Sequence, residues 1–505
     1  MSATPWGIEA RPVEVEVDVQ TGLPQIQIVG LPDAAVREAR ERVRAALRNC
    51  GFDLPPRAVT VNLAPADLRK EGNHLDLAIA TALLAAHGAL DASYLGGRML
   101  AGELGLDGAV RPIRGALAIA DAAARSGCSE LLLPATNAAE AAALEALPAR
   151  GVLALPELVA HLCGEAPLPA APGDREWAPR GEPAVDLAEV HGQELPKRAL
   201  EIAAAGGHNL LFVGPPGAGK TMLARALPGI LPPLSRLEAV AVTKVHSLVA
   251  DEPPDGLLRH RPFRSQHAGV SPPGLVGGGP FSRPGEASLA HSGVLFLDEL
   301  AEFRRDALEA LRAPLEDGAI TICRARARHL FPARFQLVAA MNPCPCGHLG
   351  DPRHACRCPL PLVERYRARI SGPLLDRIDL HVEVAPVRLA ELRERECERS
   401  REVAERVQRA RERQATRFPA GHVAPVNASL ASRGLREHCR LDTAGQRLLD
   451  AAFERLGLSA RALTRILKVA RTIADLAGAD GLAAAHVAEA IQFRSLDRRL
   501  APQVS

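Results

Sequence analysis

The sequence is poor in aromatic residues and has no long apolar run. Only 3% of its 505 residues are aromatic, so we expect hydrophobic cores built from Ala, Leu, Val and Ile. No window approaches the ~18 uninterrupted apolar residues that a membrane span needs. The first residues lack a basic start followed by an apolar stretch, so no signal peptide is expected. These absences together predict a cytoplasmic protein without a membrane partner.

Net charge is almost absent as well. The 61 basic and 59 acidic side chains leave a formal charge of +2, which excludes a globally basic nucleic-acid binder but not a local basic patch. Hydrophobic residues make up 47% of the chain, which excludes wholesale disorder. In the cytoplasm the ten cysteines are not expected to form structural disulfides. Four of them nevertheless lie between Cys344 and Cys358, a clustering that composition does not explain.

The chain is longer than the ~250–300 residues that one hydrophobic core supports, so we expect several domains. Residues 1–163 mix short alternating strands with helices, which predicts an α+β domain. Residues 164–184 are rich in Pro, Gly and Ala and predict a linker. The strongly apolar strands within 185–387 are typical of a parallel sheet covered on both faces, hence an α/β fold. Residues 388–505 are expected to be helical.

A glycine-rich motif follows the apolar strand at 209–213. Residues 214–221 match G-x-x-x-x-G-K-[ST] between a strand and a helix-compatible run, which is the setting of a phosphate-binding loop. Lys220 can reach the β- and γ-phosphate oxygens, and the Thr221 hydroxyl can ligate Mg²⁺. A chance glycine-rich turn is the alternative. We therefore predict ATP and Mg²⁺ as cofactors. The predicted ATP-binding residues are Gly214, Pro215, Pro216, Gly217, Ala218, Gly219, Lys220 and Thr221.

Two carboxylates follow a second apolar strand, at 294–297. This arrangement places Asp298 near the metal and directs Glu299 toward an attacking water. A glutamate at this point is typical of ATP hydrolysis rather than of nucleotide storage. The alternative is an acidic pair that stabilises the start of a helix.

The cysteine cluster is predicted to hold a metal. Two C-x-C pairs lie in the loop 342–361: Cys344 with Cys346, and Cys356 with Cys358. This spacing is tighter than the C-x₂₋₄-C of most zinc hairpins, but four thiols in one loop favour a structural, tetrahedral Zn²⁺. His348 and His354 could each replace one thiol. A full Cys₄ set would leave no open position for catalysis. A reduced, metal-free loop is the alternative.

Taken together, these motifs resemble the AAA+ ATPases. The strings at 293–300, 331–343 and 371–380 are similar, more narrowly, to the magnesium-chelatase-like branch, and the chain is identified as a member of its YifB/ComM family. The resemblance covers nearly the whole chain. It implies an AAA+ P-loop core, a C-terminal helical lid, and an N-terminal domain like that of Lon proteases, with the ribosomal S5 domain 2-like fold.

The resemblance also implies roles for single residues. Asn342 matches the sensor that orients the attacking water. Arg377 matches the arginine finger that reaches a neighbouring subunit's γ-phosphate, and Arg461 matches the second sensor in the lid. An arginine supplied in trans couples hydrolysis to assembly, here of a homohexameric ring. Without the resemblance each arginine would be assigned to a surface salt bridge. Residues 190–193 resemble the segment that packs near the adenine.

The N-terminal domain is not expected to be a protease. Residues 70–80 resemble the Lon proteolytic domain, but His74 stands where those enzymes have their nucleophilic serine, and Leu117 stands where the lysine base is expected. A Ser/Lys mechanism needs an activated hydroxyl, so the domain is expected to serve assembly or substrate contact.

Basic residues offer two candidate surfaces for DNA. The period-two alternation over 320–329 predicts a hairpin strand with Arg324, Arg326 and Arg328 on one face. Its position matches the pore-lining hairpin of this AAA+ clade, where arginines could track phosphates. A solvated, edge-protecting hairpin is the alternative. The second surface comprises Arg259, Arg261, Arg264, His267 and Arg283. The run 393–413 balances Arg against Glu and predicts a solvated helix face.

The resemblance thus implies an ATP-driven hexameric DNA motor, a helicase that promotes branch migration in natural transformation or homologous recombination. Two alternatives use the same core. One is a magnesium-chelatase motor subunit, although such subunits lack the Lon-like domain. The other is an AAA+ chaperone or protease regulator, which the sequence does not separate from the DNA motor.

Overall fold

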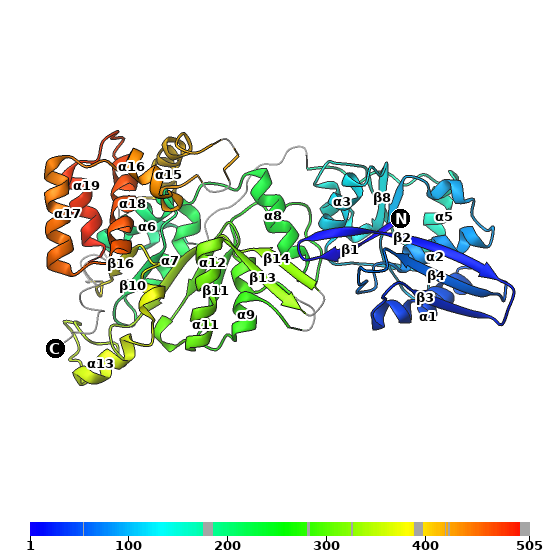
Figure 1. Cartoon of the computed structure of the whole chain (residues 1–505), viewed down its shortest axis with the longest axis horizontal. Coiled ribbons are helices and arrows are strands. Elements are labelled where there is room, and N and C mark those ends of the chain that lie inside the picture. The colour runs from blue at the N-terminus through cyan, green and yellow to red at the C-terminus, as the bar shows by residue number, and fades with distance from the viewer. Residues whose placement is uncertain are drawn as a thin grey trace.

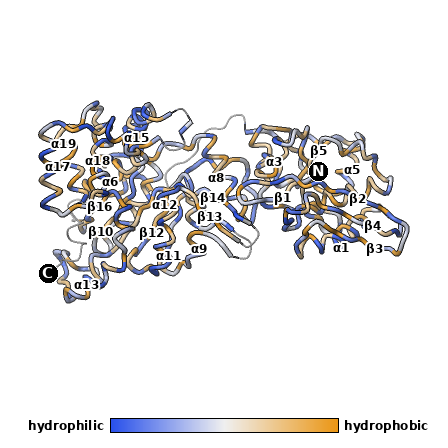
Figure 2. Tube along the Cα trace, viewed as in Figure 1, coloured by the Kyte–Doolittle hydropathy of each residue, from blue (hydrophilic) through white to orange (hydrophobic). Residues whose placement is uncertain are grey.

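The computed structural model describes residues 1–53, 55–174, 185–279, 283–324, 327–387, 397–419, 421–422 and 425–494. The molecule is elongated, with the N-terminal region at one end, the C-terminal helices at the other and a parallel sheet between them (Figure 1). Hydrophobic and hydrophilic residues alternate along the helices (Figure 2). Accordingly, no helix among the described residues is long and apolar enough to cross a membrane.

A mixed sheet and two helices form the first layer of the N-terminal region. Its strands are β1 (Ser2–Trp6), β2 (Glu9–Gln20), β4 (Ala58–Ala64) and β3 (Gln25–Val29), in that order. Helices α1 (Ala34–Asn49) and α2 (Asp76–Ala86) pack against this sheet. The Asp33 carboxylate caps α1 by accepting from the Val36 N–H at 2.8 Å, which fixes where the helix begins.

A second, parallel sheet completes this region. Its strands are β5 (Arg98–Leu100), β8 (Glu130–Pro134) and β9 (Ala149–Val152), flanked by α3 (Ala116–Arg125), α4 (Ala138–Ala142) and α5 (Leu155–Leu162). The short strands β6 (Glu103–Leu104) and β7 (Val110–Arg111) pair beside it. Part of the expected linker packs here, because Leu168 is buried and the Ala171 N–H donates to the Ala149 carbonyl at 2.7 Å.

The central sheet has five parallel strands. In spatial order they are β11 (Phe263–Gln266), β12 (Val294–Leu297), β15 (Gln336–Met341), β10 (Leu210–Val213) and β16 (Leu380–Glu383). Along β10, Leu210 and Phe212 enter one hydrophobic cluster, whereas Leu211 and Val213 enter another on the opposite face. The predicted parallel α/β sheet covered on both faces is therefore confirmed.

Different helices cover the two faces of this sheet. Helix α6 (Glu194–Gly206) and the C-terminal helices share one cluster with the sheet. Helices α9 (Pro272–Val276), α10 (Glu286–Leu289) and α11 (Arg305–Ala310) contribute to the other. The antiparallel hairpin of β13 (Ala319–Arg324) and β14 (Ala327–Pro332) extends from this second side.

The described residues after 397 form helices. They are α15 (Ser400–Ala415), α16 (Ser432–His438), α17 (Thr443–Leu456), α18 (Ala460–Leu476) and α19 (Ala484–Gln492). The solvated face expected for the arginine-rich run is found at the exposed Arg401, but not at Arg411. The Arg411 guanidinium donates to the Ala204 carbonyl at 2.7 Å, and burial lowers its pKa to about 9. This contact anchors α15 on α6.

Helix α8 (Arg236–Ser247) connects the central sheet to the N-terminal region (Figure 1). The Gly115 N–H donates to the Ser247 hydroxyl at 3.0 Å, and Lys244 Nζ lies 2.8 Å from Asp121. The hairpin makes a second contact, because the ring of His329 lies 4.7 Å from that of Trp6. Two separate contacts therefore fix how the N-terminal region sits on the core.

Candidate active site

The phosphate-loop motif lies at the carboxyl end of β10, directly before helix α7 (Lys220–Ala226). A Cβ atom added at Gly214 would lie 2.2 Å from the Val384 carbonyl oxygen, so no side chain fits there. Gly219 has φ +91°, a conformation that favours glycine. The glycines therefore let the loop turn tightly at the edge of a parallel sheet where nucleotides bind in this class of fold.

Lys220 and Asn342 contact each other beside this loop. Lys220 Nζ donates to the carbonyls of Gly214 at 2.6 Å and Pro215 at 2.9 Å, and to Asn342 Oδ1 at 3.2 Å. Burial lowers the pKa of the Lys220 ammonium to about 8, against a smaller raising effect from the carboxylates of Asp298 and Glu299. The cation therefore rests on backbone oxygens that phosphate oxygens can replace.

Thr221 and Asp298 form a pair that fits Mg²⁺. The Thr221 hydroxyl donates to Asp298 Oδ2 at 3.0 Å. Neighbouring ligands of an octahedral Mg²⁺, each ~2.1 Å from the ion, are ~3.0 Å apart. The two oxygens are therefore spaced as adjacent ligands of one magnesium ion.

Glu299 is held in an uncommon backbone conformation. Its φ is +55° and its N–H donates to Asp298 Oδ1 at 2.9 Å, while the side chain is exposed. A non-glycine residue in this region costs ~1–3 kcal/mol and is most often found at functional sites. The exposed Glu299 carboxylate could accept a proton from water.

Gln193 contributes a contact that its motif alone does not indicate. Its Nε2 donates to the carbonyls of Ala218 at 3.2 Å and Ala385 at 2.7 Å. The segment 190–193, expected near the adenine, thus lies against the phosphate loop and the end of β16. The sequence motif at 190–193 could not predict the hydrogen bond from Gln193 to Ala385, because the two residues are almost 200 positions apart.

Arg377 and Arg461 line a separate cleft of about 190 Å³. The cleft is lined by Glu316, Asp376, Arg377, Arg461, Thr464, Arg465 and Lys468. The phosphate loop is described in full, and none of its residues is among them. The structure therefore places the two arginines with each other but not in the phosphate loop of their own chain.

The side chains of Arg377 and Arg461 differ in exposure and in the contacts they make. Only 8% of the Arg377 side chain is exposed, and its guanidinium pairs with Glu316 of α12 (Arg312–Asp317) and donates to the Pro373 carbonyl. Its buried Nε has no hydrogen-bond partner among the described residues. Arg461 is 71% exposed and lies 3.9 Å from Asp376. Sequence reasoning missed Glu316, which stands 61 positions from Arg377.

Comparison with known proteins identifies the chain. A family model described as magnesium chelatase, subunit ChlI, matches residues 186–392, and related models match 15–137 and 397–494. The YifB protein of Salmonella typhimurium is 45% identical, over 98% of this chain and 96% of its own length. The competence protein ComM of Haemophilus influenzae is 45% identical, over 99% and 97%.

The chain belongs to the YifB/ComM family of magnesium-chelatase-like AAA+ ATPases. Membership of this family implies ATPase activity with ATP and Mg²⁺, which the Lys220, Thr221 and Asp298 geometry fits. A true chelatase component is more distant, because the magnesium-chelatase 67 kDa subunit of Heliobacterium mobile is 28% identical over 33% of this chain and 29% of its own length.

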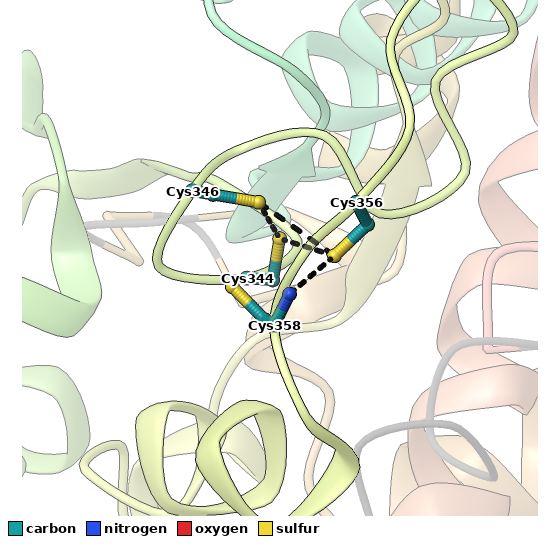
Figure 3. Close-up of side chains that lie close together, drawn as sticks. All are labelled: Cys344, Cys346, Cys356 and Cys358. Atoms are coloured by element: carbon teal, nitrogen blue, oxygen red, sulfur yellow. Dashed lines mark hydrogen bonds between the residues drawn. The ribbon is translucent and has the colours of Figure 1, made fainter.

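The four clustered cysteines converge on one point (Figure 3). Their sulfur atoms all lie within 4.8 Å of one another, with separations of 3.4 Å between Cys344 and Cys346 and 3.6 Å from Cys356 to each of those two. A tetrahedral zinc with Zn–S bonds of ~2.3 Å has sulfur–sulfur edges of ~3.8 Å. Backbone N–H groups of His348 and Arg357 lower the pKa of Cys346. The donor set therefore fits a structural Zn²⁺.

The two loop histidines are engaged elsewhere. Nδ1 of His348 lies 3.2 Å and Nδ1 of His354 lies 3.0 Å from the same oxygen of Asp351. The four thiols already provide the four ligands of a tetrahedral metal site without these histidines. Replacement of a thiol by histidine is therefore not needed to account for the cluster.

The hairpin corrects one expectation. Strand β13 ends at Arg324 and β14 begins at Ala327, with Cys323 opposite Arg328 and Arg324 opposite Ala327. Arg324 and Arg328 thus lie on different strands, in adjacent pairs of the two-stranded ladder. The expectation of one strand through residues 320–329 is wrong, because β13 ends at Arg324 and the chain reverses before β14 begins at Ala327. Arg328 is exposed, and Arg326 lies outside the described residues.

The second basic surface is largely neutralised within the chain. Arg259 lies 2.6 Å from Asp174, Arg261 lies 3.1 Å from Glu238, and Arg264 lies 2.6 Å from Glu286. Arg283 and His267 are exposed. Three of the five residues expected to contact DNA therefore form ion pairs within the chain. These ion pairs make the surface a weaker candidate for DNA binding.

His74 and Leu117, which the sequence resemblance placed at the positions of the Ser/Lys dyad, are buried. Burial lowers the pKa of His74 to about 4, so its imidazole stays neutral, and Leu117 packs with Val242 of α8. Neither side chain can supply a hydroxyl nucleophile or a lysine base.

Proposed function

We propose that this chain is an ATP-driven motor that acts on DNA, a helicase that promotes branch migration in natural transformation or homologous recombination. The observation that carries the proposal is the 45% identity to a competence protein over nearly both full lengths. Competence is the state in which bacteria take up DNA, so the relative's name supports DNA as the substrate. A cytoplasmic site of action is part of the proposal.

ATP hydrolysis supplies the motor's free energy, and each role rests on a contact. Lys220 binds the β- and γ-phosphates, and Asn342, 3.2 Å from Lys220 Nζ, orients the attacking water. Thr221 and Asp298 hold Mg²⁺, which neutralises charge on the transferring phosphoryl group. Glu299, exposed beside them, accepts the water's proton.

Assembly completes the site. Arg377 and Arg461 share a cleft to which the phosphate loop does not contribute, which supports their action on the nucleotide of a neighbouring subunit in a homohexameric ring. Arg377 must leave Glu316 to do so. This ion pair would hold the arginine back until a neighbour's phosphate competes for it, which links hydrolysis to ring formation.

The remaining parts of the chain would contact DNA and support the fold. The exposed Arg328 and its hairpin neighbours Arg324 and Arg326 would contact DNA phosphates in the pore. The cysteine loop would carry one structural Zn²⁺. The N-terminal region, Lon-like and without a dyad, would serve assembly or substrate contact, and the residues after 388 would form the lid.

Two alternatives remain distinct proposals. A chelatase motor subunit is disfavoured, because the chelatase relative matches only a third of this chain. A chaperone or protease regulator would use the same ATP site, so only its response to substrate separates it from a DNA motor.

Stimulation of ATP hydrolysis tests the proposal. We expect forked or single-stranded DNA to raise the hydrolysis rate of the purified chain, and an unfolded protein to leave it unchanged. Replacing Arg324, Arg326 and Arg328 with Ala should preserve basal hydrolysis and abolish the stimulation. Stimulation by unfolded protein alone would favour the chaperone alternative instead.

A further inference from the structure

The cysteine loop is continuous with the candidate ATP site. Cys344 follows two residues after Asn342, whose side-chain oxygen accepts from Lys220 Nζ at 3.2 Å. Cys344 is fully buried. Only Pro343 therefore separates Cys344 from the residue that contacts Lys220.

The same loop also packs against the phosphate loop. A Cβ atom placed on Gly347 would lie 2.6 Å from Cδ and 2.8 Å from Cγ of Pro216. Separations below ~3 Å are not tolerated between carbon atoms in close-packed protein. Gly347 follows Cys346 directly, so the residue next to a candidate metal ligand packs against Pro216 with no room for a side chain.

Contacts on the outer side hold the loop in this position. Arg367 of α13 (Leu360–Arg367) donates to the Pro343 carbonyl at 3.2 Å, and Arg353 donates to the Val387 carbonyl at 2.6 Å. Asp351 gathers His348 and His354. Two hydrogen bonds thus tie the loop to α13 and to Val387, and the Asp351 contacts join two of the loop's own histidines.

We propose that the metal-loaded cysteine loop positions the phosphate loop and Asn342, so that metal occupancy controls nucleotide binding and hydrolysis. This inference rests on the proposed ATPase site and on the proposed zinc. Gly347 acts as a positioning residue through Pro216, and Cys344 acts through Asn342. The zinc then has a function at a distance from the chemistry, although its closed Cys₄ shell excludes it from catalysis.

Two glycines of the loop provide a matched test. Gly347 has φ +83° and Gly350 has φ +81°, so alanine strains the backbone equally at both. A Cβ on Gly350 would meet only Glu383 Oε1, at 4.0 Å. The variants Gly347→Ala and Gly350→Ala therefore differ in the contact with Pro216 and leave all four cysteines in place.

The measurements are zinc content by elemental analysis, the Kd of a fluorescent ATP analogue, and kcat and KM for hydrolysis. We expect about one zinc per chain in the native protein and in both variants. We expect Gly347→Ala to weaken nucleotide binding and to lower kcat/KM by ~10- to 100-fold, since a misplacement of ~1 Å can cost that much. Gly350→Ala should stay within ~2-fold of the native protein, because its added carbon meets nothing closer than 4.0 Å.

A rescue experiment isolates the contact. Pro216→Ala removes the Cγ and Cδ atoms that the new side chain would strike. In this background Gly347→Ala should have little further effect, a non-additivity that only directly interacting residues show.

Metal removal completes the test. Cys356→Ser should lower the zinc content and weaken binding of the ATP analogue in the same preparation. Equal nucleotide affinity in Gly347→Ala and Gly350→Ala, or native nucleotide affinity in a Cys356→Ser preparation that has lost its zinc, would overturn the inference. An absence of ATP hydrolysis in the native protein would instead contradict the proposed function, so the two failures are distinguishable.

Discussion

Lys220 links nucleotide binding to protonation. Its ammonium donates to the Gly214 and Pro215 carbonyls, and burial lowers its pKa to about 8. Bound phosphates are anionic and favour the charged form, so they raise this pKa. Because the nucleotide-bound protein then holds more protons than the free protein, binding takes up a proton above pH 8.

Nucleotide affinity should therefore fall as the pH rises through 8. We expect the Kd of a fluorescent ADP analogue to be constant near pH 7 and to rise by up to ~10-fold per pH unit above the free-state pKa. Lys220→Arg keeps its charge throughout and should bind more weakly but without this dependence. A flat profile for the native protein between pH 7 and 9.5 would contradict the assignment.

At the scale of single residues, the sequence predicted the features that short motifs encode. The phosphate loop, the Asp298–Glu299 pair and the cysteine spacing are short patterns whose chemistry follows from residue type and order. The partners Glu316, Gln193 and Gly347 were not predicted, because each meets its contact from a distant segment. Such contacts depend on packing, which short motifs do not encode.

At the scale of elements, apolar patterning predicted the strands and most helices. Strands β10 and β12 are apolar at every position because both sides of the sheet are covered there, whereas the edge strand β11 carries Arg264, Ser265 and Gln266. The hairpin was predicted less well, since its alternation runs through Arg324 to Arg328 without a turn residue. Periodicity alone places residues on a strand but does not show where the chain reverses.

Helix α18 depends on one buried charge. The Asp475 carboxylate accepts from Arg417 at 2.6 Å, Arg471 at 2.9 Å and Asn427 at 2.8 Å. In Asp475→Asn a neutral amide replaces the carboxylate, so the charges of both arginines lose their buried counter-charge. We expect this variant to lose ~3–5 kcal/mol of unfolding free energy, measured by urea titration and circular dichroism.

Asp450 provides the control for this prediction. It is exposed on α17 and accepts from Gln446 at 2.8 Å. Asp450→Asn should change stability by less than ~0.5 kcal/mol. Equal stabilities of the two variants would show that the buried network contributes nothing to the helical region.

At the scale of the whole molecule, we propose that a second chain completes the active site. The cleft lined by Arg377 and Arg461 includes no residue of the phosphate loop. The N-terminal region contacts both α8 and the hairpin proposed to hold DNA. Neither arrangement can be deduced from sequence without knowing how the segments pack.

Mixing two inactive variants tests the shared site. Arg377→Ala retains Glu299, and Glu299→Gln retains Arg377, so each should lose at least ~100-fold in hydrolysis alone. A mixed ring contains interfaces with an intact Glu299 facing an intact Arg377. We expect phosphate release to recover on mixing. Continued inactivity in rings shown to contain both variants would contradict an arginine supplied in trans.

The most direct test of the central claim is ATP-driven movement of a DNA branch. A three- or four-stranded junction with one labelled strand is incubated with the chain and either ATP or ADP, and product strands are separated on a gel. The account predicts strand release with ATP, none with ADP, and none with Glu299→Gln although that variant binds ATP. A native preparation that hydrolyses ATP but neither responds to DNA nor moves the branch would contradict it.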